Sequence, residues 1–258
     1  MSQLKIEVTG GIHVKGTVEN ANLKSGNNII VGSGIISESI PNVNEPPKIT
    51  TILEAGNDIQ AMFINLTEAW AGNDILIQKY VMHSNIRAKH DILVGDKGGK
   101  GAIICGNAEC GHVLKANIIG SDAYLKTIIS CGPREALREE KRAVDKSLKQ
   151  RSSEHVQLLN ILEKVEARSD TEKVGSVLLH KKIKITAAIN ALVERLEKLN
   201  LIEEELTLRI TMASGAHVEV EKTIFPKTLV SINDSSQLVT IEKRKCKIIC
   251  RDGGINFE

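Results

Sequence analysis

A pentapeptide recurs in the first half of this 258-residue sequence at an almost constant spacing. Ala-Gly-Asn-Asp-Ile occupies residues 55–59 and again 71–75, and a degraded copy, Ala-Lys-His-Asp-Ile, occupies 88–92. The three isoleucines are therefore sixteen and then seventeen residues apart. A short fixed period is the signature of a solenoid, in which each repeat stacks on its neighbours. No other feature of the sequence constrains the fold as strongly.

Related segments continue the period in both directions. Gly26-Asn27-Asn28-Ile29 and Gly11-Ile12 precede the three copies, and Cys110-Gly111-His112-Val113 follows them after a glycine-rich insertion. Two further pairs of apolar residues share the spacing of seventeen: Ile64 with Val81, and Ile86 with Ile103. We therefore expect more than one inward-facing position in each repeat.

The length and composition of the repeat indicate β structure. Sixteen or seventeen residues are too few for a helical repeat, whereas they suit one coil of a β-helix with two or three short strands. Runs of Val, Ile and Leu alternate with Gly, Asn and Asp, as in short buried strands joined by tight turns. Aromatic residues make up only 2% of the chain, so the core must be aliphatic. We predict a parallel β-helix, and expect it to be right-handed.

Two segments interrupt the repeats. Glu38 to Thr51 contains three prolines and no alternation, so we interpret it as a loop inserted between coils. Gly95 to Gly101 is the richest glycine run. A phosphate-binding loop would need Ser or Thr after Lys100 and a helix behind it. Ala102-Ile103-Ile104 follows instead, which indicates a turn between strands.

The pattern becomes helical after Pro133. Apolar residues recur in heptads through two glycine-poor stretches, and Ser169-Asp170-Thr171-Glu172 between them is a potential capping box. The first heptad seam is Leu137, Val144, Leu148, Leu158, Leu162 and Val165, interrupted by Arg151 and His155. The second is Leu178, Ile185, Ile189, Leu192, Leu196, Leu199 and Leu206. Two helices with a short connection must turn back on each other, so we predict an antiparallel coiled-coil hairpin whose arms are each roughly 50 Å long.

A period of two returns near Thr207. Leu208, Ile210 and Met212 alternate with polar residues, and further alternating segments follow up to Cys250. The predicted organisation is a mainly β protein with a long helical hairpin: a β-helix at 1–132, an antiparallel coiled coil at 133–205, and β-strands at 206–258 that extend or cap the solenoid.

Composition excludes several classes of function. The chain has 34 basic and 32 acidic residues, and this balance provides no field for nucleic acid or an anionic membrane. No apolar run approaches the roughly twenty residues of a membrane span. Residues 1–11 do not resemble a secretory signal, so we expect a cytoplasmic protein. We interpret the five cysteines as buried core residues, with metal binding as the alternative.

The order of these elements resembles the flagellar assembly protein A family of bacteria. The Ala-Gly-Asn-Asp-Ile repeats, Lys97 to Ile103, and Ala116 to Ser121 before the helices carry the resemblance. Two positions depart from the family pattern: Cys105-Gly106 replaces Gly-Gly, and Lys227-Thr228 replaces a glycine after Phe225-Pro226. Members usually carry an N-terminal domain before the repeats, which leads us to expect a fragment or a short member.

The resemblance implies a cytoplasmic, non-enzymatic scaffold of flagellar assembly and motility. Its expected partners are proteins of the flagellar or polar machinery and further copies of itself, with recruitment to the cell pole or flagellar base and without membrane insertion. The resemblance supplies no catalytic residue and no cofactor. One alternative is a self-polymerising protein similar to bactofilin. The other is a carbohydrate-active β-helix enzyme, although the solenoid has only one Trp, two Tyr and one Phe to serve as the aromatic platforms that sugar sites use.

Two sets of residues are candidates for binding. Leu159, Ile161 and Ile183 lie off the heptad seams, so we predict that they contact a partner. Asp58, Asp74 and Asp91 should stack at one corner of the coil, about 4.8 Å apart, where each adjacent pair would repel by about 3 kcal/mol before screening. We expect each carboxylate to accept hydrogen bonds from the backbone of its own turn, and the alternative is a cation such as calcium that bridges two of them.

Histidines also occupy this corner. His90 and His112 stand where earlier repeats have Asn27, Asn57 and Asn73. We interpret both as turn residues, and a catalytic base is the alternative.

Overall fold

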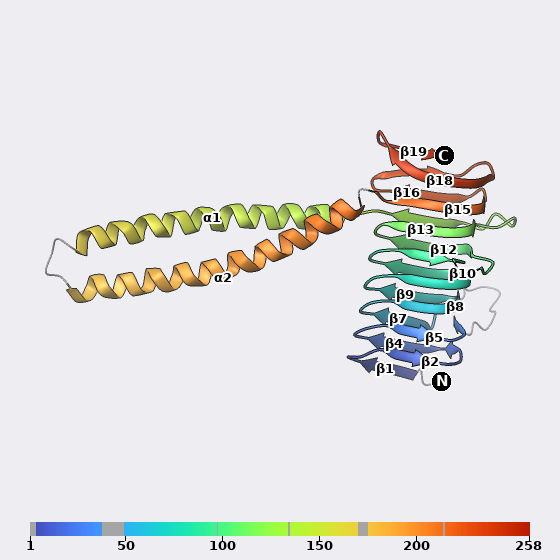
Figure 1. Ribbon diagram of the computed structural model, residues 1–258, viewed down its shortest axis with the longest axis horizontal. Helices are drawn as coiled ribbons and strands as arrows, with labels where there is room; N and C mark the ends of the chain where they lie inside the picture. The colour runs from blue at the N-terminus through green and yellow to red at the C-terminus, as the bar shows by residue number, and fades with distance from the viewer. Residues whose placement is uncertain (1–3, 38–48, 97, 134, 170–174, 214) are drawn as a thin grey trace. The chain divides into compact units, whose positions relative to one another are not determined.

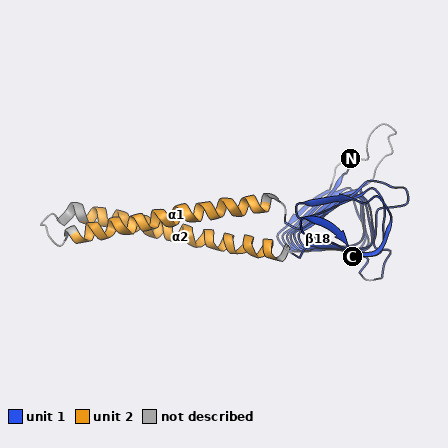
Figure 2. Ribbon diagram, turned by 90° about the horizontal axis from the view of Figure 1, so that it is seen from above, with its two compact units in different colours: residues 1–134, 212–258 blue, residues 135–211 orange. Residues whose placement is uncertain are grey.

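The computed structural model describes the chain except for residues 1–3, 38–48, 97, 134, 170–174 and 214 (Figure 1). The chain forms two compact units, one made of residues 1–134 and 212–258 and the other of residues 135–211 (Figure 2). Most of the predicted loop at 38–51 and most of the predicted capping box at 169–172 lie outside the described residues.

The first unit is a β-helix of stacked parallel strands (Figure 1). Its strands before the helices are β1 (Leu4–Val8), β2 (Ile12–Val14), β3 (Val18–Glu19), β4 (Ala21–Ser25), β5 (Ile29–Val31), β6 (Gly34–Ile36), β7 (Thr51–Ala55), β8 (Ile59–Asn65), β9 (Thr67–Ala71), β10 (Ile75–Ala88), β11 (Ile92–Val94), β12 (Ala102–Cys110), β13 (Val113–Ile119) and β14 (Thr127–Cys131). Parallel pairing of β1 with β4, of β4 with β7 and of β7 with β9 shows how each strand stacks on the equivalent strand of the next coil.

The strand register confirms the sixteen- to seventeen-residue period. Ile59 pairs with Ile75 and Ile75 with Ile92, and Ile64 pairs with Val81. The predicted alignment of Ile86 with Ile103 is wrong, because Ile103 pairs with Val81 instead. The glycine-rich segment between β11 and β12 lengthens that coil, so the seventeen-residue spacing no longer applies there.

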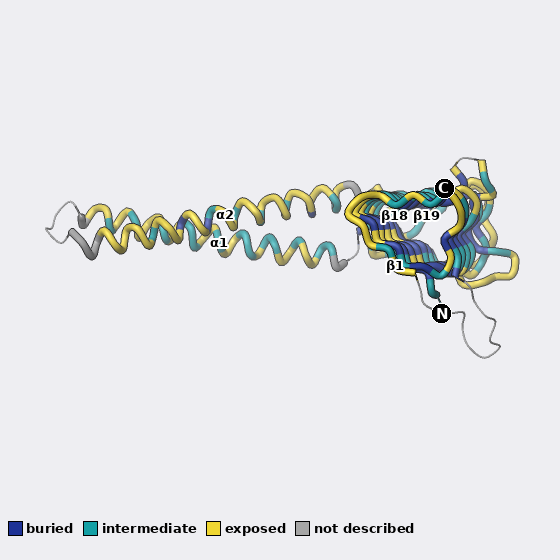
Figure 3. Tube along the Cα trace, turned by 90° about the horizontal axis from the view of Figure 1, so that it is seen from below, coloured by how far each residue is buried: buried dark blue, intermediate teal, exposed yellow. Residues whose placement is uncertain are grey.

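The core lies inside the coils, and buried residues alternate with less buried ones along many of the strands (Figure 3). Its fully buried aliphatic side chains include Leu53, Ile59, Ile64, Ile75, Ile92 and Leu114. Burial of one such side chain contributes about 1.5–3 kcal/mol, and each coil shares its apolar surface with the coils on both sides. Cys110 and Cys131 are buried as predicted, whereas Cys105, Cys246 and Cys250 are only half-buried.

A corner of the coil requires a left-handed backbone. Leu66, His83 and Cys105 follow paired strand residues in successive coils and have φ values of 52°, 49° and 55°. Side chains with a Cβ rarely adopt this conformation, and glycine adopts it freely. Cys105 therefore departs from the family pattern at a position where glycine would avoid backbone strain.

The C-terminal strands first extend the solenoid and then turn antiparallel. They are β15 (His217–Ile224), β16 (Thr228–Ile232), β17 (Ser235–Leu238), β18 (Lys243–Arg251) and β19 (Gly254–Phe257). β15 stacks in parallel on β13 and β16 on β14, whereas β17 pairs antiparallel with β16, and β18 pairs antiparallel with β15 and β19. These antiparallel strands lie at the end of the solenoid opposite to the N-terminus (Figure 1).

The second unit is a hairpin of two long helices, α1 (Glu135–Ser169) and α2 (Gly175–Ala213). Ion pairs of Lys141 with Glu203 and of Glu166 with Lys182 show that the helices run antiparallel. The prediction of a strand beginning near Thr207, and with it the boundary at 205–206, is wrong because α2 continues to Ala213. Leu206 and Ile210 are four residues apart and continue the heptad seam, which outweighs the local alternation of apolar and polar residues.

Candidate functional site

The two helices of the hairpin, α1 and α2, pack against each other along one apolar seam. Positions spaced alternately by four and three residues, the heptad pattern of a coiled coil, are all buried or half-buried. On α1 they are Leu137, Lys141, Val144, Leu148, Arg151, His155, Leu158, Leu162 and Val165. On α2 they are Ile185, Ile189, Leu192, Leu196, Leu199, Glu203, Leu206 and Ile210. The predicted seam is therefore confirmed except at Leu178, whose side chain lies outside the described part of the chain, and Lys141 and Glu203 are additional polar members.

These two residues form a polar layer in the seam. Lys141 Nζ lies 2.6 Å from Glu203 Oε1 and 3.2 Å from Asp145 Oδ1, and Thr207 Oγ1 donates a hydrogen bond to Glu203 Oε1 over 2.8 Å. The hydrogen bond with Glu203 raises the pKa of Lys141, and the same bond lowers the pKa of Glu203. A polar layer inside an apolar seam disfavours other alignments, so this network specifies the register of the two helices.

An apolar face lies beside the seam in the half of the hairpin distant from the polar layer. Val156 and Leu159 on α1, and Leu179 and Ile183 on α2, are 56%, 44%, 58% and 58% exposed. Val156 and Leu159 each stand one residue after a seam position, and Leu179 and Ile183 each stand one residue after a position to which the heptad spacing extends, 178 and 182. All four are therefore rotated from the seam in the same sense. Because the helices are antiparallel, this rotation turns all four side chains toward one side of the hairpin. We call Val156, Leu159, Leu179 and Ile183 the apolar face.

The structure separates the three predicted partner-binding residues. Leu159 and Ile183 belong to the apolar face. Ile161 is 47% exposed and stands one residue before the seam position Leu162, so it points to the opposite side of the hairpin. Val156 and Leu179 extend the surface and were not among the sequence candidates, although the same heptad count would have identified them.

The polar corner of the solenoid carries the predicted aspartates. Asp58 Oδ1 accepts hydrogen bonds from Asn73 Nδ2 at 2.9 Å and from the backbone amide of Asp74 at 3.2 Å. Asp74 Oδ1 accepts from the amide of Asp91 at 3.0 Å, and Asp91 Oδ1 accepts from the amide of Val113 at 2.8 Å. The prediction that each carboxylate accepts from its own turn is therefore wrong. Each carboxylate accepts from a backbone amide of the following coil, because stacking places that amide within reach.

Asp58, Asp74 and Asp91 form an aspartate ladder, and the pKa of Asp74 in its middle is raised above the ordinary value. Burial is the largest cause, and the negative charges of Asp91 and Asp58 act in the same direction. The hydrogen bond from the Asp91 amide and the proximity of His90 oppose the change. The ladder therefore offsets part, but not all, of the cost of holding this carboxylate between two others.

Asp74→Asn is expected to stabilise the solenoid by about 0.5 kcal/mol at pH 7, because asparagine retains the acceptor oxygen and removes a half-buried charge. The folded protein binds the Asp74 proton more tightly than the unfolded chain does. The destabilisation caused by the Asp74 charge is therefore absent below the ordinary aspartate pKa of 3.8 and develops as pH rises through the folded pKa. Urea unfolding at pH 3 and pH 7 measures the difference, and Glu68→Gln on the exposed side of β9 is the charge-matched control. A variant less stable than wild type at pH 7 would contradict this expectation.

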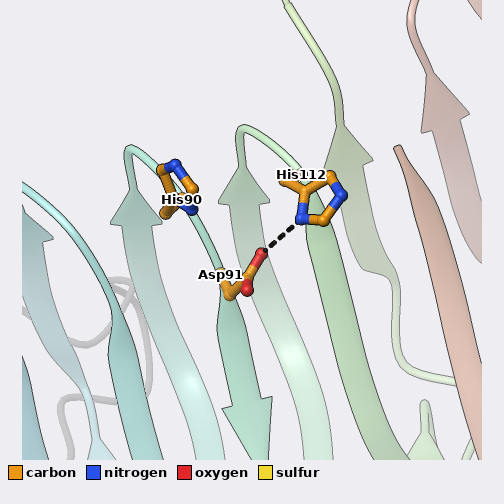
Figure 4. A group of neighbouring side chains, drawn as sticks. All are labelled: His90, Asp91 and His112. Carbon is orange, nitrogen blue, oxygen red and sulfur yellow. Dashed lines mark hydrogen bonds and ion pairs between the residues drawn. The ribbon is translucent and has the colours of Figure 1, made fainter. Parts of the chain in front are cut away.

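Two histidines meet the last aspartate of the ladder (Figure 4). His112 Nδ1 lies 3.1 Å from Asp91 Oδ1, and one ligand atom from each of His90, Asp91 and His112 lies within 4.8 Å of the others. All three residues are half-buried. The sequence placed both histidines at this corner, and the backbone bonds from the His90 amide to Asn73 and from the His112 amide to His90 confirm that alignment. Their proximity to Asp91, however, was not predicted.

The fold and the hairpin define a class: β-solenoid proteins with an antiparallel coiled coil inserted between strands. Residues 1–255 match FapA, the Flagellar Assembly Protein A beta solenoid domain, so the chain belongs to this family of flagellar assembly proteins. Comparisons with curated proteins and with solved structures found no match. Within the described residues, no helix is both long and apolar enough to cross a membrane.

Proposed function

We propose that this protein is a non-enzymatic cytoplasmic scaffold of flagellar assembly that acts as a homo-oligomer. The apolar face of the hairpin is the observation that carries the proposal. Four large aliphatic side chains on one side of the coiled coil expose a surface that its single seam does not use. Family membership supplies the connection with flagellar assembly.

A second copy of the chain fits this surface best. Glu163 stands on the same side of α1 as Leu159, and Lys184 follows Ile183 on α2. From the two ion pairs along the hairpin, Glu163 and Ile183 lie at nearly the same height. A two-fold axis parallel to the hairpin would place α1 of one copy against α2 of the other. Apolar side chains would then meet apolar ones, and Glu163 of one copy would lie near Lys184 of the other.

The dimensions of the surface suit a short contact. From Val156 to the height of Leu179 the face extends about eleven residues, or roughly 16 Å along the axis. Two copies would form a four-helix arrangement over that length, as in helix bundles. Such a contact is small compared with stable obligate interfaces, so we expect a reversible association that strengthens with protein concentration.

Leu159→Glu combined with Ile183→Glu is expected to weaken self-association by at least about 100-fold, because two apolar anchors are lost and four like charges meet at the dimer interface. Analytical ultracentrifugation over a range of concentrations measures the change. Leu201→Glu is the matched control: Leu201 is 67% exposed and stands two residues after the seam position Leu199, so it points away from the apolar face. Equal weakening in the control, or a wild-type chain that remains monomeric at high concentration, would reject the proposal.

Polymerisation similar to that of bactofilin remains the second candidate. Filaments built by stacking solenoid ends need open strand edges, and antiparallel strands β17, β18 and β19 occupy the C-terminal end. This observation favours a closed oligomer over a filament. Electron microscopy of concentrated protein distinguishes the two. Localisation at the cell pole or flagellar base, through protein partners of that machinery, is part of the same proposal, and fluorescence microscopy of a tagged chain in motile cells tests it.

A further inference from the structure

His90, Asp91 and His112 gather two imidazoles and one carboxylate at one corner of the solenoid (Figure 4). His90 and Asp91 lie in the turn between β10 and β11, and His112 lies in the turn between β12 and β13. These turns belong to adjacent coils, because β11 pairs with β13. The two imidazole rings are 6.2 Å apart between centroids and inclined by 57°, and the carboxylate of Asp91 lies beside them.

We propose that these three residues bind one zinc ion. Nitrogen and oxygen ligands stand about 2.0–2.1 Å from zinc, so the ligand atoms of a tetrahedral site are about 3.3 Å apart. The 3.1 Å separation between Asp91 Oδ1 and His112 Nδ1 already matches that edge. Since all three ligand atoms lie within 4.8 Å of one another, rotation of half-buried side chains closes the remaining gap. On binding, His112 coordinates zinc through Nδ1 as the neutral tautomer that carries its proton on Nε2, and two bonds to zinc replace the hydrogen bond between Asp91 and His112.

The donor set favours zinc over calcium or magnesium. Imidazole nitrogen suits zinc and similar divalent transition metals, whereas calcium and magnesium require oxygen ligands. Asp58 and Asp74, the other members of the predicted cation site, lie in earlier coils whose turns carry asparagine where the later coils carry histidine. Zinc therefore binds at the end of the aspartate ladder where the asparagines give way to histidines. Water completes the coordination, as in other sites with three protein ligands.

A third histidine lies beside the site without joining it. The rings of His217 and His112 are 6.2 Å apart between centroids in an edge-to-face arrangement. His217 Nδ1 lies 2.8 Å from the Gly215 carbonyl oxygen, and its Nε2 lies 3.1 Å from Glu219 Oε1. Both nitrogens of His217 therefore have partners of their own, and this residue limits the space around His112 rather than supplying a ligand.

Zinc bound in this way links two adjacent coils. Because a solenoid is held together mainly by contacts between neighbours, a link across one of its interfaces resists the opening of that interface. Zinc at about ten times its dissociation constant is expected to raise the melting temperature of the full-length protein by about 3–6 °C. The site is therefore structural in its effect, and its occupation does not depend on the hairpin proposal.

Titration of the full-length protein with zinc chloride, by calorimetry and by thermal melting, tests the proposal. His90→Asn and His112→Asn should each weaken binding by more than the roughly 10- to 100-fold cost of losing an outer-shell partner. Both variants should fold, because Asn57 and Asn73 occupy the equivalent position of earlier coils. Cobalt substituted for zinc should show the visible spectrum of nitrogen and oxygen ligands.

His13→Asn is the matched control, since His13 is an exposed histidine of β2 in the same unit. It should leave zinc affinity and the zinc-dependent melting shift unchanged. A melting temperature indifferent to zinc and to chelator would overturn the proposal. Cobalt bands typical of thiolate ligands would also overturn it, and so would undiminished zinc affinity in both His90→Asn and His112→Asn. Either result would show that the ion binds at another site.

Discussion

Replacing Ile75 by alanine is expected to lower the free energy of unfolding by about 3–5 kcal/mol, toward the upper end for such truncations. Ile75 is fully buried at the start of β10 and pairs with Ile59 in the preceding coil and Ile92 in the following one. Removing its side chain leaves a cavity with aliphatic walls on both sides. Urea unfolding followed by circular dichroism measures the loss.

The position of Ile75 within the stacked coils also predicts which coils lose stability when its side chain is removed. Because each coil contacts only its neighbours, the weakened interface should separate the unfolding of the N-terminal coils from that of the C-terminal coils. Hydrogen exchange should therefore increase first in β8, β10 and β11. Leu76→Ala is the control on the same strand: Leu76 is only half-buried, and its truncation should cost less than about 1.5 kcal/mol. Equal losses of unfolding free energy in Ile75→Ala and Leu76→Ala would show that the buried, inward-facing side chains do not dominate the stability of the solenoid.

Excision of residues 135–213, with a short glycine-serine linker in their place, is expected to leave a folded solenoid that no longer self-associates. Among the described residues, none of those in the apolar core of the solenoid belongs to the hairpin, and β15 and β16 continue the stack on β13 and β14. The excised protein should therefore retain its β-sheet circular dichroism, lose its helical signal and become monomeric. Light scattering at matched concentrations of the intact and excised chains measures the change in mass.

The excision also locates the interface. If the excised chain keeps the mass of the intact oligomer, self-association belongs to the solenoid and the proposed role of the apolar face is wrong. A solenoid that fails to fold would be recognised by loss of the cooperative melt. In that case the Leu159→Glu and Ile183→Glu combination tests the same surface with the whole chain present.

The helical hairpin was largely predictable from local sequence. Heptads such as Ile185, Ile189, Leu192 and Leu196 identify both the helix and its buried side, because a helix repeats its faces every seven residues. The end of α2 was not predictable in this way. Between Thr207 and Met212 the residues satisfy both a period of two and a heptad. The structure decides for the helix, in which Leu206 is buried and Ile210 is half-buried at heptad positions.

The sequence predicted where the polar corner lies in the repeat, but it did not predict which groups its side chains contact. The repeat placed Asp74 and Asp91 above one another, and the structure confirms the stacking. Which amide each carboxylate reaches depends on the offset between coils, which the sequence does not specify. For the same reason the proximity of His90 and His112 to Asp91 was missed: the glycine-rich segment lengthens one coil, and the register after it becomes known only when the strands are paired.

The sequence alone determined that this chain is a β-solenoid with an inserted coiled coil, because both patterns arise from contacts between neighbouring repeats or neighbouring turns of a helix. The inward residues of each strand, exemplified by Ile59 and Ile75, follow from the same local rule. Only the tertiary structure decided the register across the insertion, the antiparallel strands at the C-terminal end, the residues that share the apolar face and the meeting of His90, Asp91 and His112. These features depend on which side chains approach through space after the coils have stacked, and no periodicity in the chain encodes that approach.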